Sequence, residues 1–145
     1  MRGPRDNANV LYDRDCGFCR WTLAQILRLD RERRLRPLPI QSDEGQRLLA
    51  GVPEDVRLAS WHLVTADGQV RSGAAGFPGL FDRLPAGAPV ARLTALLQGP
   101  SALGYRLLVD NRTRLGRRIG AERRDRATAF LDERERSVRV GQAAG

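Results

Sequence analysis

The sequence has little that would staple a fold covalently or anchor it in a membrane. Only two of its 145 residues are cysteines, too few for the disulfide framework of a small secreted domain. No apolar run approaches the roughly 18 residues that a membrane-spanning helix needs. Residues 1–9 are polar and lack the apolar core of a signal peptide. We therefore expect a cytoplasmic domain, long enough to be held together by its hydrophobic core.

Lysine is absent, and histidine occurs once. All 25 basic residues are arginine, and the formal net charge is +8, a balance that can indicate nucleic-acid binding. The arginines are scattered, however, and acidic residues alternate with them at residues 31–34 and 133–136. This interleaving favours a solvated surface over a nucleic-acid site. The densest basic stretch, residues 112–126, would still attract an acidic partner or membrane surface. The single histidine, His62, is expected to be a partly exposed strand residue.

The two cysteines, Cys16 and Cys19, stand three positions apart. They follow a short apolar run at residues 10–12 and precede a helix-like run at residues 20–29. This order of strand, CxxC and helix is the arrangement that thiol–disulfide chemistry uses. Residues at i and i+3 lie on the same side of a helix. We expect Cys16 at or just before the first turn and Cys19 one turn inside, facing the core.

The start of a helix favours an anion, because its first backbone N–H groups lack partners and the helix dipole is positive there. That position lowers the pKa of the Cys16 thiol. The flanking charges are mixed, with acids that oppose this shift and bases that reinforce it: Asp13, Asp15, Arg14 and Arg20. Cys16 is therefore the expected nucleophile on a substrate disulfide. Cys19 is the expected resolving thiol, which releases the mixed disulfide.

Two other interpretations of the pair stay open. The cysteines could be inert in catalysis, in a module that only binds a partner protein. They could also supply half of a metal site, because zinc usually takes four ligands and a homodimer with two CxxC pairs offers four thiolates. The redox interpretation needs no bound cofactor. Its partners are thiols and disulfides of proteins or small molecules, and an external thiol reductant supplies the electrons.

Periodicity and turn residues predict a β-α-β-α-β-β order in the first half of the chain. The expected strands cover residues 9–12, 35–40, 60–65 and 69–72, and the expected helices cover residues 16–29 and 43–50. Residues 51–59 are expected to form a loop, and Asp67-Gly68 a hairpin turn. Pro37 and Pro39 weaken the second strand, but a βαβ unit requires a parallel mate there.

The first helix has an apolar stripe that continues from Cys19 through Leu23, Ile26 and Leu27. Its solvated face is expected to carry Arg20, Ala24, Arg28 and Arg31.

The second half is expected to be helical. Short helices are predicted at residues 73–84 and 90–97, the latter ended by Gly99 and Pro100. Ser101 is expected to cap a longer helix. The apolar stripe predicted for that helix is Leu103, Leu107, Leu108, Leu115 and Ile119. Residues 121–140 predict a charged, peripheral helix. The expected division is a flexible arm at residues 1–8, a domain at residues 9–120, and a partly helical extension at residues 121–145.

The order of elements resembles a thioredoxin-like α/β fold, with a central mixed sheet of about four strands flanked by helices and with extra C-terminal helices. More narrowly, residues 12–19, Tyr-Asp-Arg-Asp-Cys-Gly-Phe-Cys, resemble the DCC family of thiol–disulfide oxidoreductases, named for an Asp-x-x-Cys-x-x-Cys motif after the first strand. Weaker similarities are Pro37-Leu38, residues 62–68 with 73–75, Tyr105, and Asn111-Arg112. The resemblance implies a redox pair at the start of the first helix.

The sequence departs from that pattern in two places. Arg14 stands where the family usually has glycine, and so places a bulky cation beside the pair. Residues 57–61, before the third strand, contain no proline, whereas thioredoxins hold substrate peptides with a cis-proline there.

The positions of four further residues make them candidates for the site. Asp13 is either a proton acceptor for Cys19 or a capping residue. Phe18 and Trp21 are candidates for contact with substrate, although an aromatic residue at the position of Trp21 is more often packed against its neighbours. Arg112, on a late helix, is expected at the rim of the site or in a surface ion pair.

Overall fold

The computed structural model describes residues 7–140 and contains a four-stranded mixed sheet covered by helices. The strands are β1 (Ala8–Tyr12), β2 (Leu35–Pro39), β3 (His62–Thr65) and β4 (Val70–Ser72). The helices are α1 (Gly17–Leu29), α2 (Asp43–Leu48), α3 (Glu54–Arg57), α4 (Phe77–Asp82), α5 (Ala88–Leu96), α6 (Gln98–Arg118) and α7 (Ala121–Ser137). A 3-10 turn, η2 (Gly73–Gly76), precedes α4. The thioredoxin-like α/β fold expected from the sequence is confirmed.

The sheet has the order β2-β1-β3-β4. β1 runs parallel to β2 and antiparallel to β3, so the unit β1-α1-β2 is the predicted βαβ crossover. Pro37 and Pro39 pair with Val10 and Tyr12. They are tolerated because β2 is an edge strand, so no further strand needs a hydrogen bond from the N–H groups that proline lacks. The hairpin at Asp67-Gly68 joins β3 to β4, with Gly68 at a φ of 85°.

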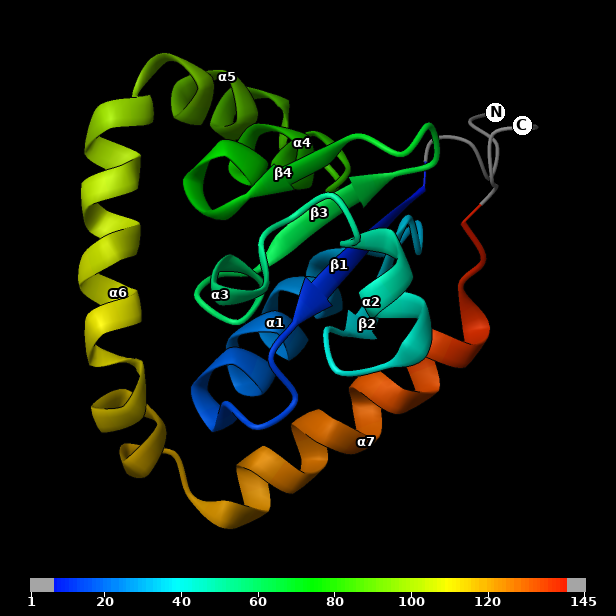
Figure 1. Cartoon of the computed structure of the whole chain (residues 1–145), viewed down its shortest axis with the longest axis vertical. Coiled ribbons are helices and arrows are strands. Elements are labelled where there is room, and N and C mark those ends of the chain that lie inside the picture. The colour runs from blue at the N-terminus through cyan, green and yellow to red at the C-terminus, as the bar shows by residue number, and fades with distance from the viewer. Residues whose placement is uncertain (1–6, 141–145) are drawn as a thin grey trace.

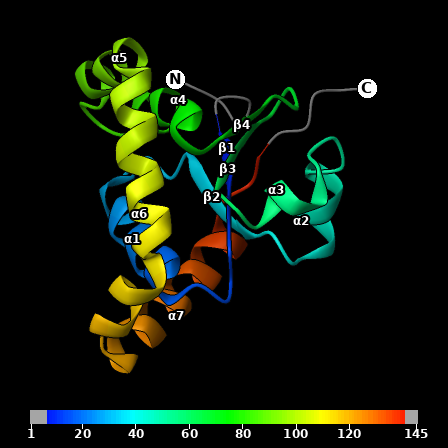
Figure 2. The same cartoon turned by 60° about the vertical axis from the view of Figure 1, so that its left-hand side comes forward.

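The sheet is sandwiched between two sets of helices (Figures 1 and 2). Helices α1, α6 and α7 lie on one side of it and α2 and α3 on the other. Each side has its own apolar cluster, because successive residues of β1 point to opposite faces. Val10 and Tyr12 pack with α1 and α7, whereas Leu11 packs with Ile40 and with Leu49, just after α2.

Helix α7 is not peripheral, which corrects the sequence-based expectation. Ala127 and Leu131 are buried in the larger of the two apolar clusters, the one that contains Val10 and Tyr12 and is called the main core cluster below, and the helix lies against α1 and β2. It covers the face of α1 that the sequence analysis assigned to solvent. Ala24 is fully buried there, and the half-buried Arg20 donates to Oγ1 of Thr128 at 3.0 Å. The amphipathic pattern of α1 alone could not reveal a second helix packing on its far side.

Helix α6 also differs from the expectation. It begins at Gln98, so Gly99 and Pro100 lie in its first turn and do not end the preceding helix. Proline is tolerated there because the first N–H groups of a helix lack partners anyway. The predicted apolar stripe is largely exposed, with Leu103 at 61% and Leu107 at 57% of full exposure. The helix instead turns Tyr105, Val109, Arg112 and Gly116 toward the protein.

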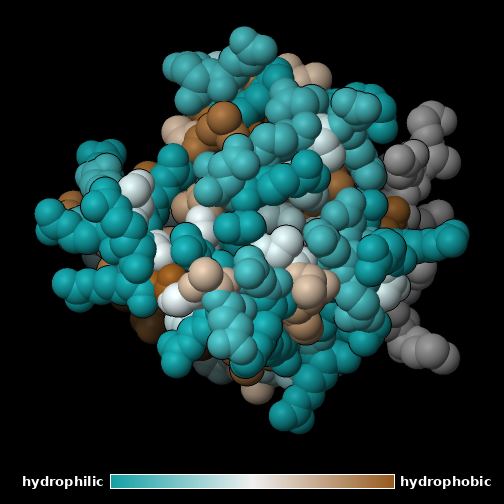
Figure 3. All heavy atoms as spheres, turned by 90° about the horizontal axis from the view of Figure 1, so that it is seen from below, coloured by the Kyte–Doolittle hydropathy of each residue, from teal (hydrophilic) through white to brown (hydrophobic). Residues whose placement is uncertain are grey.

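The face seen from below, over α7 and the end of α6, is mainly hydrophilic (Figure 3). Within residues 7–140, no helix is both long enough and apolar enough to cross a membrane.

His62 is fully buried, which corrects the expectation of a partly exposed strand residue. Its ring nitrogens are both engaged: Nδ1 lies 2.7 Å from Oγ of Ser72, and Nε2 lies 2.9 Å from the carbonyl oxygen of Arg57. Burial lowers the pKa of His62 below its ordinary value, and the hydrogen bond to the Arg57 carbonyl opposes that shift only in part. The histidine ties β4 and the end of α3 to β3.

This burial predicts a loss of stability in mild acid. Below about pH 6.5 the unfolded chain takes up a proton on His62 that the folded protein does not, so the unfolded state is favoured as the pH falls. The loss is at most about 1.4 kcal/mol per pH unit and stops at the folded-state pKa. Urea unfolding at pH 7.5, 6.5 and 5.5 measures it. His62→Gln is the control: if its stability falls by the same amount over this range, His62 is not the group responsible.

Candidate active site

The cysteine pair begins α1. Cys16 is the N-cap residue in an extended conformation, and its Sγ accepts a hydrogen bond from the backbone N–H of Cys19 at 3.2 Å. Its carbonyl oxygen accepts the first helical hydrogen bond, from the N–H of Arg20 at 3.1 Å. The two cysteines form a disulfide with their Cα atoms 5.2 Å apart, within the usual range for a bridged pair. The position predicted for Cys16 is thus confirmed, and both side chains are half-buried.

The loop before α1 is fixed by Asp13 and Gln41. One carboxylate oxygen of Asp13, Oδ1, accepts hydrogen bonds from the N–H of Asp15 at 2.9 Å and from Nε2 of Gln41 at 2.7 Å. Oε1 of Gln41 accepts from the N–H of Arg14 at 3.1 Å. Gln41 follows β2, and the sequence analysis missed it because no local signal connects it to a loop 28 residues away. The side chain of Arg14 is exposed.

A second arginine lies beside the cysteine pair. A Cβ atom built on Gly17 would lie 2.7 Å from Cδ and 3.6 Å from Nη1 of Arg124. Gly17 directly follows Cys16, so α7 lays this guanidinium-bearing side chain over the first residue of α1. Arg124 could not be picked out from the sequence, since it lies in the helix that was expected to be peripheral. Arg124 therefore adds a positive charge at the N-terminal end of α1, where the helix dipole already favours an anion.

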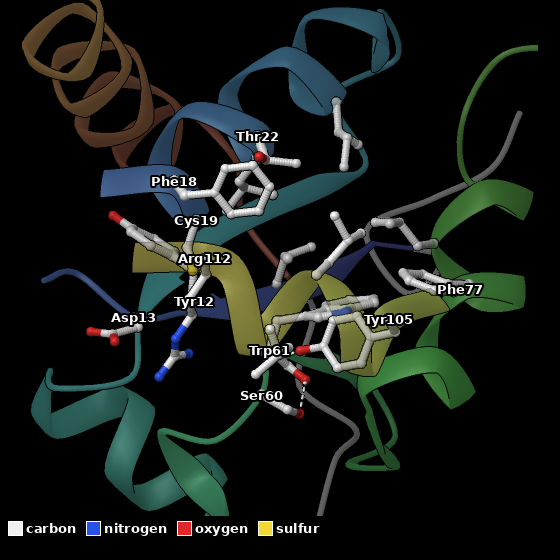
Figure 4. A pocket seen from close by; sticks show the side chains of 16 residues that line it. Tyr12, Asp13, Phe18, Cys19, Thr22, Ser60, Trp61, Phe77, Tyr105 and Arg112 are labelled. Carbon is white, nitrogen blue, oxygen red and sulfur yellow. Dashed lines mark hydrogen bonds between the residues drawn. The ribbon is translucent and has the colours of Figure 1, made fainter. Parts of the chain in front are cut away.

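A pocket of about 150 Å³ extends from the cysteine pair, between β1, α1, the segment just before β3, α4 and α6 (Figure 4). Cys19 lines it, whereas Cys16 does not. The residues that form it are mostly apolar: Val10, Tyr12, Asp13, Phe18, Cys19, Thr22, Leu23, Ile26, Ser60, Trp61, Phe77, Leu80, Tyr105, Leu108, Val109 and Arg112. Besides Cys19, three candidate residues from the sequence, Asp13, Phe18 and Arg112, therefore meet there. Trp21 is not among them and packs against the main core cluster.

Arg112 and Asp13 share the pocket without pairing. Nη1 of Arg112 donates to the carbonyl oxygen of Leu58 at 3.3 Å. Among the described residues, Arg112 forms no ion pair. It is held near the start of α1 because Gly116, one turn further along α6, packs against the backbone of Phe18.

The side chain of Tyr12, which forms part of the pocket wall, is a neutral phenol. Burial and the negative charges of Asp132 and Glu135 raise its pKa to about 12, and the positive charges of Arg14 and Arg20 oppose this in part. The hydroxyl stays protonated at neutral pH. It can donate a hydrogen bond but cannot act there as an anionic base.

An aromatic cluster forms the other end of the pocket. The rings of Trp61 and Phe77 stack with centroids 5.7 Å apart, and Tyr105 meets Phe77 edge-on at 5.8 Å. The hydroxyl oxygen of Tyr105 accepts the N–H of Trp61 at 3.2 Å. Burial raises the pKa of Tyr105, partly opposed by this hydrogen bond. The cluster attaches α6 to α4 and to the segment just before β3.

The close approach of Tyr105 requires glycine at position 73. Gly73 has a φ of 57°, and a Cβ atom there would lie 3.0 Å from Cε1 of Tyr105. We expect Gly73→Ala to lower the free energy of unfolding by about 2–3 kcal/mol, from backbone strain and from displacement of the ring.

Gly68→Ala is the matched control for Gly73→Ala, because Gly68 also has a positive φ, of 85°, but no atom within 4 Å of its would-be Cβ. Strain alone should cost about 1 kcal/mol there. Urea unfolding of both variants measures the difference. Equal losses would show that Tyr105 does not constrain position 73.

Within residues 7–140, no group of three or more histidine, cysteine or acidic side chains is arranged to hold a metal ion. His62, the third potential zinc ligand in the sequence, uses its ring nitrogens on Ser72 and Arg57. A single chain therefore does not bring His62 to the two cysteines.

The fold and the cysteine pair together define a class. An N-capping cysteine, bridged to a second cysteine one turn later at the start of the first helix of a thioredoxin-like α/β domain, is the arrangement of thiol–disulfide oxidoreductases.

The narrower assignment comes from comparison with known families. The profile of the DCC1-like thiol-disulfide oxidoreductase family matches residues 10–118, and the chain belongs to that family. Neither the curated proteins nor the solved structures that were compared with the chain gave a significant match.

Proposed function

We propose that this protein reduces or exchanges disulfides, with Cys16 as the nucleophile and Cys19 as the resolving thiol. The observation that carries the proposal is the place of Cys16 at the N-cap of α1, where its Sγ accepts the N–H of Cys19. In the reduced protein this N–H and the helix dipole favour the thiolate of Cys16. Membership of the DCC1-like family supports the same chemistry.

The reaction proceeds by two exchanges. The Cys16 thiolate attacks one sulfur of a substrate R–S–S–R′, which forms a Cys16–S–S–R mixed disulfide and expels R′–S⁻. The Cys19 thiolate then attacks Cys16 Sγ, which expels R–S⁻ and forms the Cys16–Cys19 disulfide. The substrate gains two electrons, the protein loses two, and the expelled thiolates take protons from solvent. A separate dithiol reductant restores both protein thiols, so no bound cofactor is needed.

Asp13 is the proposed proton acceptor for Cys19. Both residues line the pocket, and the hydrogen bonds from Asp15 and Gln41 to Oδ1 hold the carboxylate in place. A carboxylate near the resolving thiol can take its proton as the second exchange begins. Phe18, also in the wall, is proposed to contact the substrate. Arg14 is proposed to tune the pair as an exposed charge, and Trp21 as part of the packing that supports α1.

Arg124 gives a first test of the electrostatic part of the proposal. Because its side chain lies on Gly17, we expect Arg124→Gln to slow alkylation of Cys16 at pH 7 by roughly two- to fivefold, the effect of one charge at a helix terminus. Rates of iodoacetamide labelling, followed by peptide mass spectrometry, measure the change. Arg123→Gln, an exposed neighbour on α7, is the control. If both variants label at the wild-type rate, Arg124 does not act on Cys16.

The activity itself is tested by turnover of a small disulfide. The protein is incubated with 2-hydroxyethyl disulfide and dithiothreitol, and thiol release is compared with that in dithiothreitol alone. We expect a rate proportional to protein concentration. A folded protein, checked by circular dichroism, that adds nothing to the dithiothreitol rate would contradict the proposal. The same assay tests the thiol and disulfide partners proposed from the sequence, since the reaction requires a reducing donor.

A second candidate, a non-catalytic module that binds a partner protein, is favoured by the exposed leucines of α5 and α6. Leu96 is 83% exposed, and Leu103 and Leu107 follow on the outer face of α6. Slow, equal alkylation of both cysteines would favour this module. Stoichiometric zinc or iron in freshly purified protein would instead favour a metal site shared between two chains.

A further inference from the structure

The pocket beside Cys19 has the properties of a ligand site. It reaches from the redox pair to the aromatic cluster, and Figure 4 shows Cys19, Asp13 and Arg112 toward one end and Phe77 toward the other. Val10, Leu23, Ile26, Leu80 and Val109 complete its apolar walls. A concave apolar site with a few polar groups at one end is the usual form of a small-molecule site.

The volume of the pocket limits the group that it can hold. An apolar cavity of about 150 Å³, lined by leucine, isoleucine and phenylalanine, is known to admit benzene. This pocket has about the same volume and a similar lining. One aromatic ring or one branched aliphatic group of that size therefore fills the pocket.

Arg112 supplies a charge for the ligand. Within the described chain its guanidinium has no carboxylate partner and makes one hydrogen bond, to the carbonyl of Leu58. A planar guanidinium with free N–H groups matches a carboxylate. Asp13, the acidic residue of the pocket, already uses Oδ1 for Gln41 and Asp15. An anionic ligand group at Arg112 therefore does not have to displace an existing ion pair.

The backbone beside the pocket is closed to an extended peptide. The N–H of Trp61 donates to Tyr105, and the carbonyl oxygen of Trp61 accepts the N–H of Gly73 at 3.0 Å. A peptide strand would have to replace these bonds in order to pair at Trp61. The pocket therefore favours a low-molecular-weight ligand over a protein segment.

We propose that this pocket selects low-molecular-weight disulfides that carry one ring-sized apolar group and a carboxylate. The ring occupies the space between Phe18 and Phe77, the carboxylate binds Arg112, and the disulfide lies at the cysteine pair. This inference rests on the proposed function for its redox step, which is the two-exchange reduction given above: the disulfide becomes two thiols while Cys16 and Cys19 become a disulfide. The binding step is independent of that chemistry.

Binding is measured on a protein that cannot react. In the Cys16→Ser/Cys19→Ser variant with Trp21→Phe, the remaining tryptophan, Trp61, is in the pocket wall and reports occupancy by fluorescence. We expect saturable binding of 3-phenylpropionate and binding of propionate that is about tenfold weaker or less, because propionate lacks the ring. Equal responses to the two acids, or no saturable response to 3-phenylpropionate, would overturn the proposal.

Matched variants locate the ligand. Val109→Phe fills the pocket and should weaken the binding of 3-phenylpropionate at least about tenfold. Leu107 is exposed on the same helix, so Leu107→Phe should not change this binding. Arg112→Gln should weaken it about fivefold, and Arg106→Gln should leave it unchanged. The Arg112 pair is decisive if Val109→Phe fails to fold. Equal affinities of Arg112→Gln and Arg106→Gln would overturn the carboxylate contact.

Turnover by the wild-type protein separates this inference from the proposed function. Reduction of 2,2′-dithiodibenzoate is compared with that of 3,3′-dithiodipropionate, which has the carboxylates without the rings, each relative to its rate with dithiothreitol alone. We expect the relative rate to be about tenfold higher for the aromatic disulfide. Equal relative rates would overturn the pocket's selectivity while leaving the oxidoreductase intact. If 3-phenylpropionate binds but neither disulfide is reduced, the proposed function is overturned, and so is the proposal that the ligand of the pocket is a disulfide.

Discussion

Replacement of Arg134 by alanine is expected to lower the free energy of unfolding by about 3–5 kcal/mol. Its guanidinium is buried between α7 and the end of α1, where Nη1 lies 3.0 Å from Oδ2 of Asp30. Nη2 donates to the carbonyl oxygen of Leu27 at 3.0 Å, so the arginine also caps the C-terminus of α1. Asp30 is fully buried, and its remaining partners are the backbone N–H groups of Arg34 and Leu35. Without Arg134, a buried carboxylate would have no counter-charge.

The loss is a large fraction of the roughly 5–15 kcal/mol that typically separates a folded domain from its unfolded state. Urea unfolding measures the loss. Arg136 is an exposed residue of α7, so the control variant Arg136→Ala should stay within about 0.5 kcal/mol of the wild-type stability. Arg134→Lys should fall between the two, because lysine keeps the charge but cannot reach both Asp30 and the carbonyl of Leu27. A change below about 1 kcal/mol for Arg134→Ala would show that the ion pair does not hold α7 on α1.

The second large effect concerns the cysteines. We expect Cys16→Ser to reduce disulfide turnover to the dithiothreitol background, because a serine hydroxyl is not ionised at neutral pH and cannot start the exchange. Cys19→Ser, incubated with the substrate disulfide in the absence of dithiothreitol, should stop after the first exchange: one equivalent of substrate thiol is released, and a mixed disulfide accumulates on Cys16. Intact-mass spectrometry detects this adduct directly.

The two variants are each other's control, because both replace sulfur by oxygen at the start of α1. An adduct on Cys19 in the Cys16→Ser variant, with none on Cys16 in Cys19→Ser, would reverse the roles of the two thiols. Such a reversal is a meaningful outcome, since Cys19 and not Cys16 lines the pocket.

The N-terminal half of the fold could be predicted because its signals are local. The CxxC pair follows a short apolar strand, Ser42 caps α2 through the N–H of Gly45 at 3.0 Å, and Asp67-Gly68 makes a hairpin turn. Each feature depends on residues close in sequence. The loop predicted at residues 51–59 contains the short helix α3, which is a single turn with no buried residue and hence no apolar pattern.

The C-terminal half of the fold was harder to predict, because burial there depends on which helices pack against each other. The leucines of α6 predict a buried stripe, but the contact with the rest of the protein is made by Tyr105 and Gly116, which carry no such pattern. Arg134 and Arg124 look like solvated charges in a charge-rich helix. Their contacts with Asp30 and Gly17 join positions more than 100 residues apart, which no local window contains.

The candidate site was predicted in part for the same reason. Cys16, Cys19 and Asp13 share one motif, so the sequence brings them together. Arg112 shares the pocket with Asp13 and Cys19 because α6 packs on α1, and the aromatic end of the pocket is assembled from the segment just before β3, α4 and α6. Neither contact has a signature in sequence spacing.

The central claim is that the start of α1 makes Cys16 a reactive thiolate with Cys19 behind it. Its most direct test is the pH dependence of alkylation of the fully reduced protein, with each cysteine followed separately by peptide mass spectrometry. We predict that Cys16 is alkylated rapidly below pH 7 and that Cys19 reacts much more slowly there. If the two thiols react at equal, slow rates until the pH approaches roughly 8.5, the pKa of an ordinary cysteine thiol, Cys16 is not activated and the claim is contradicted.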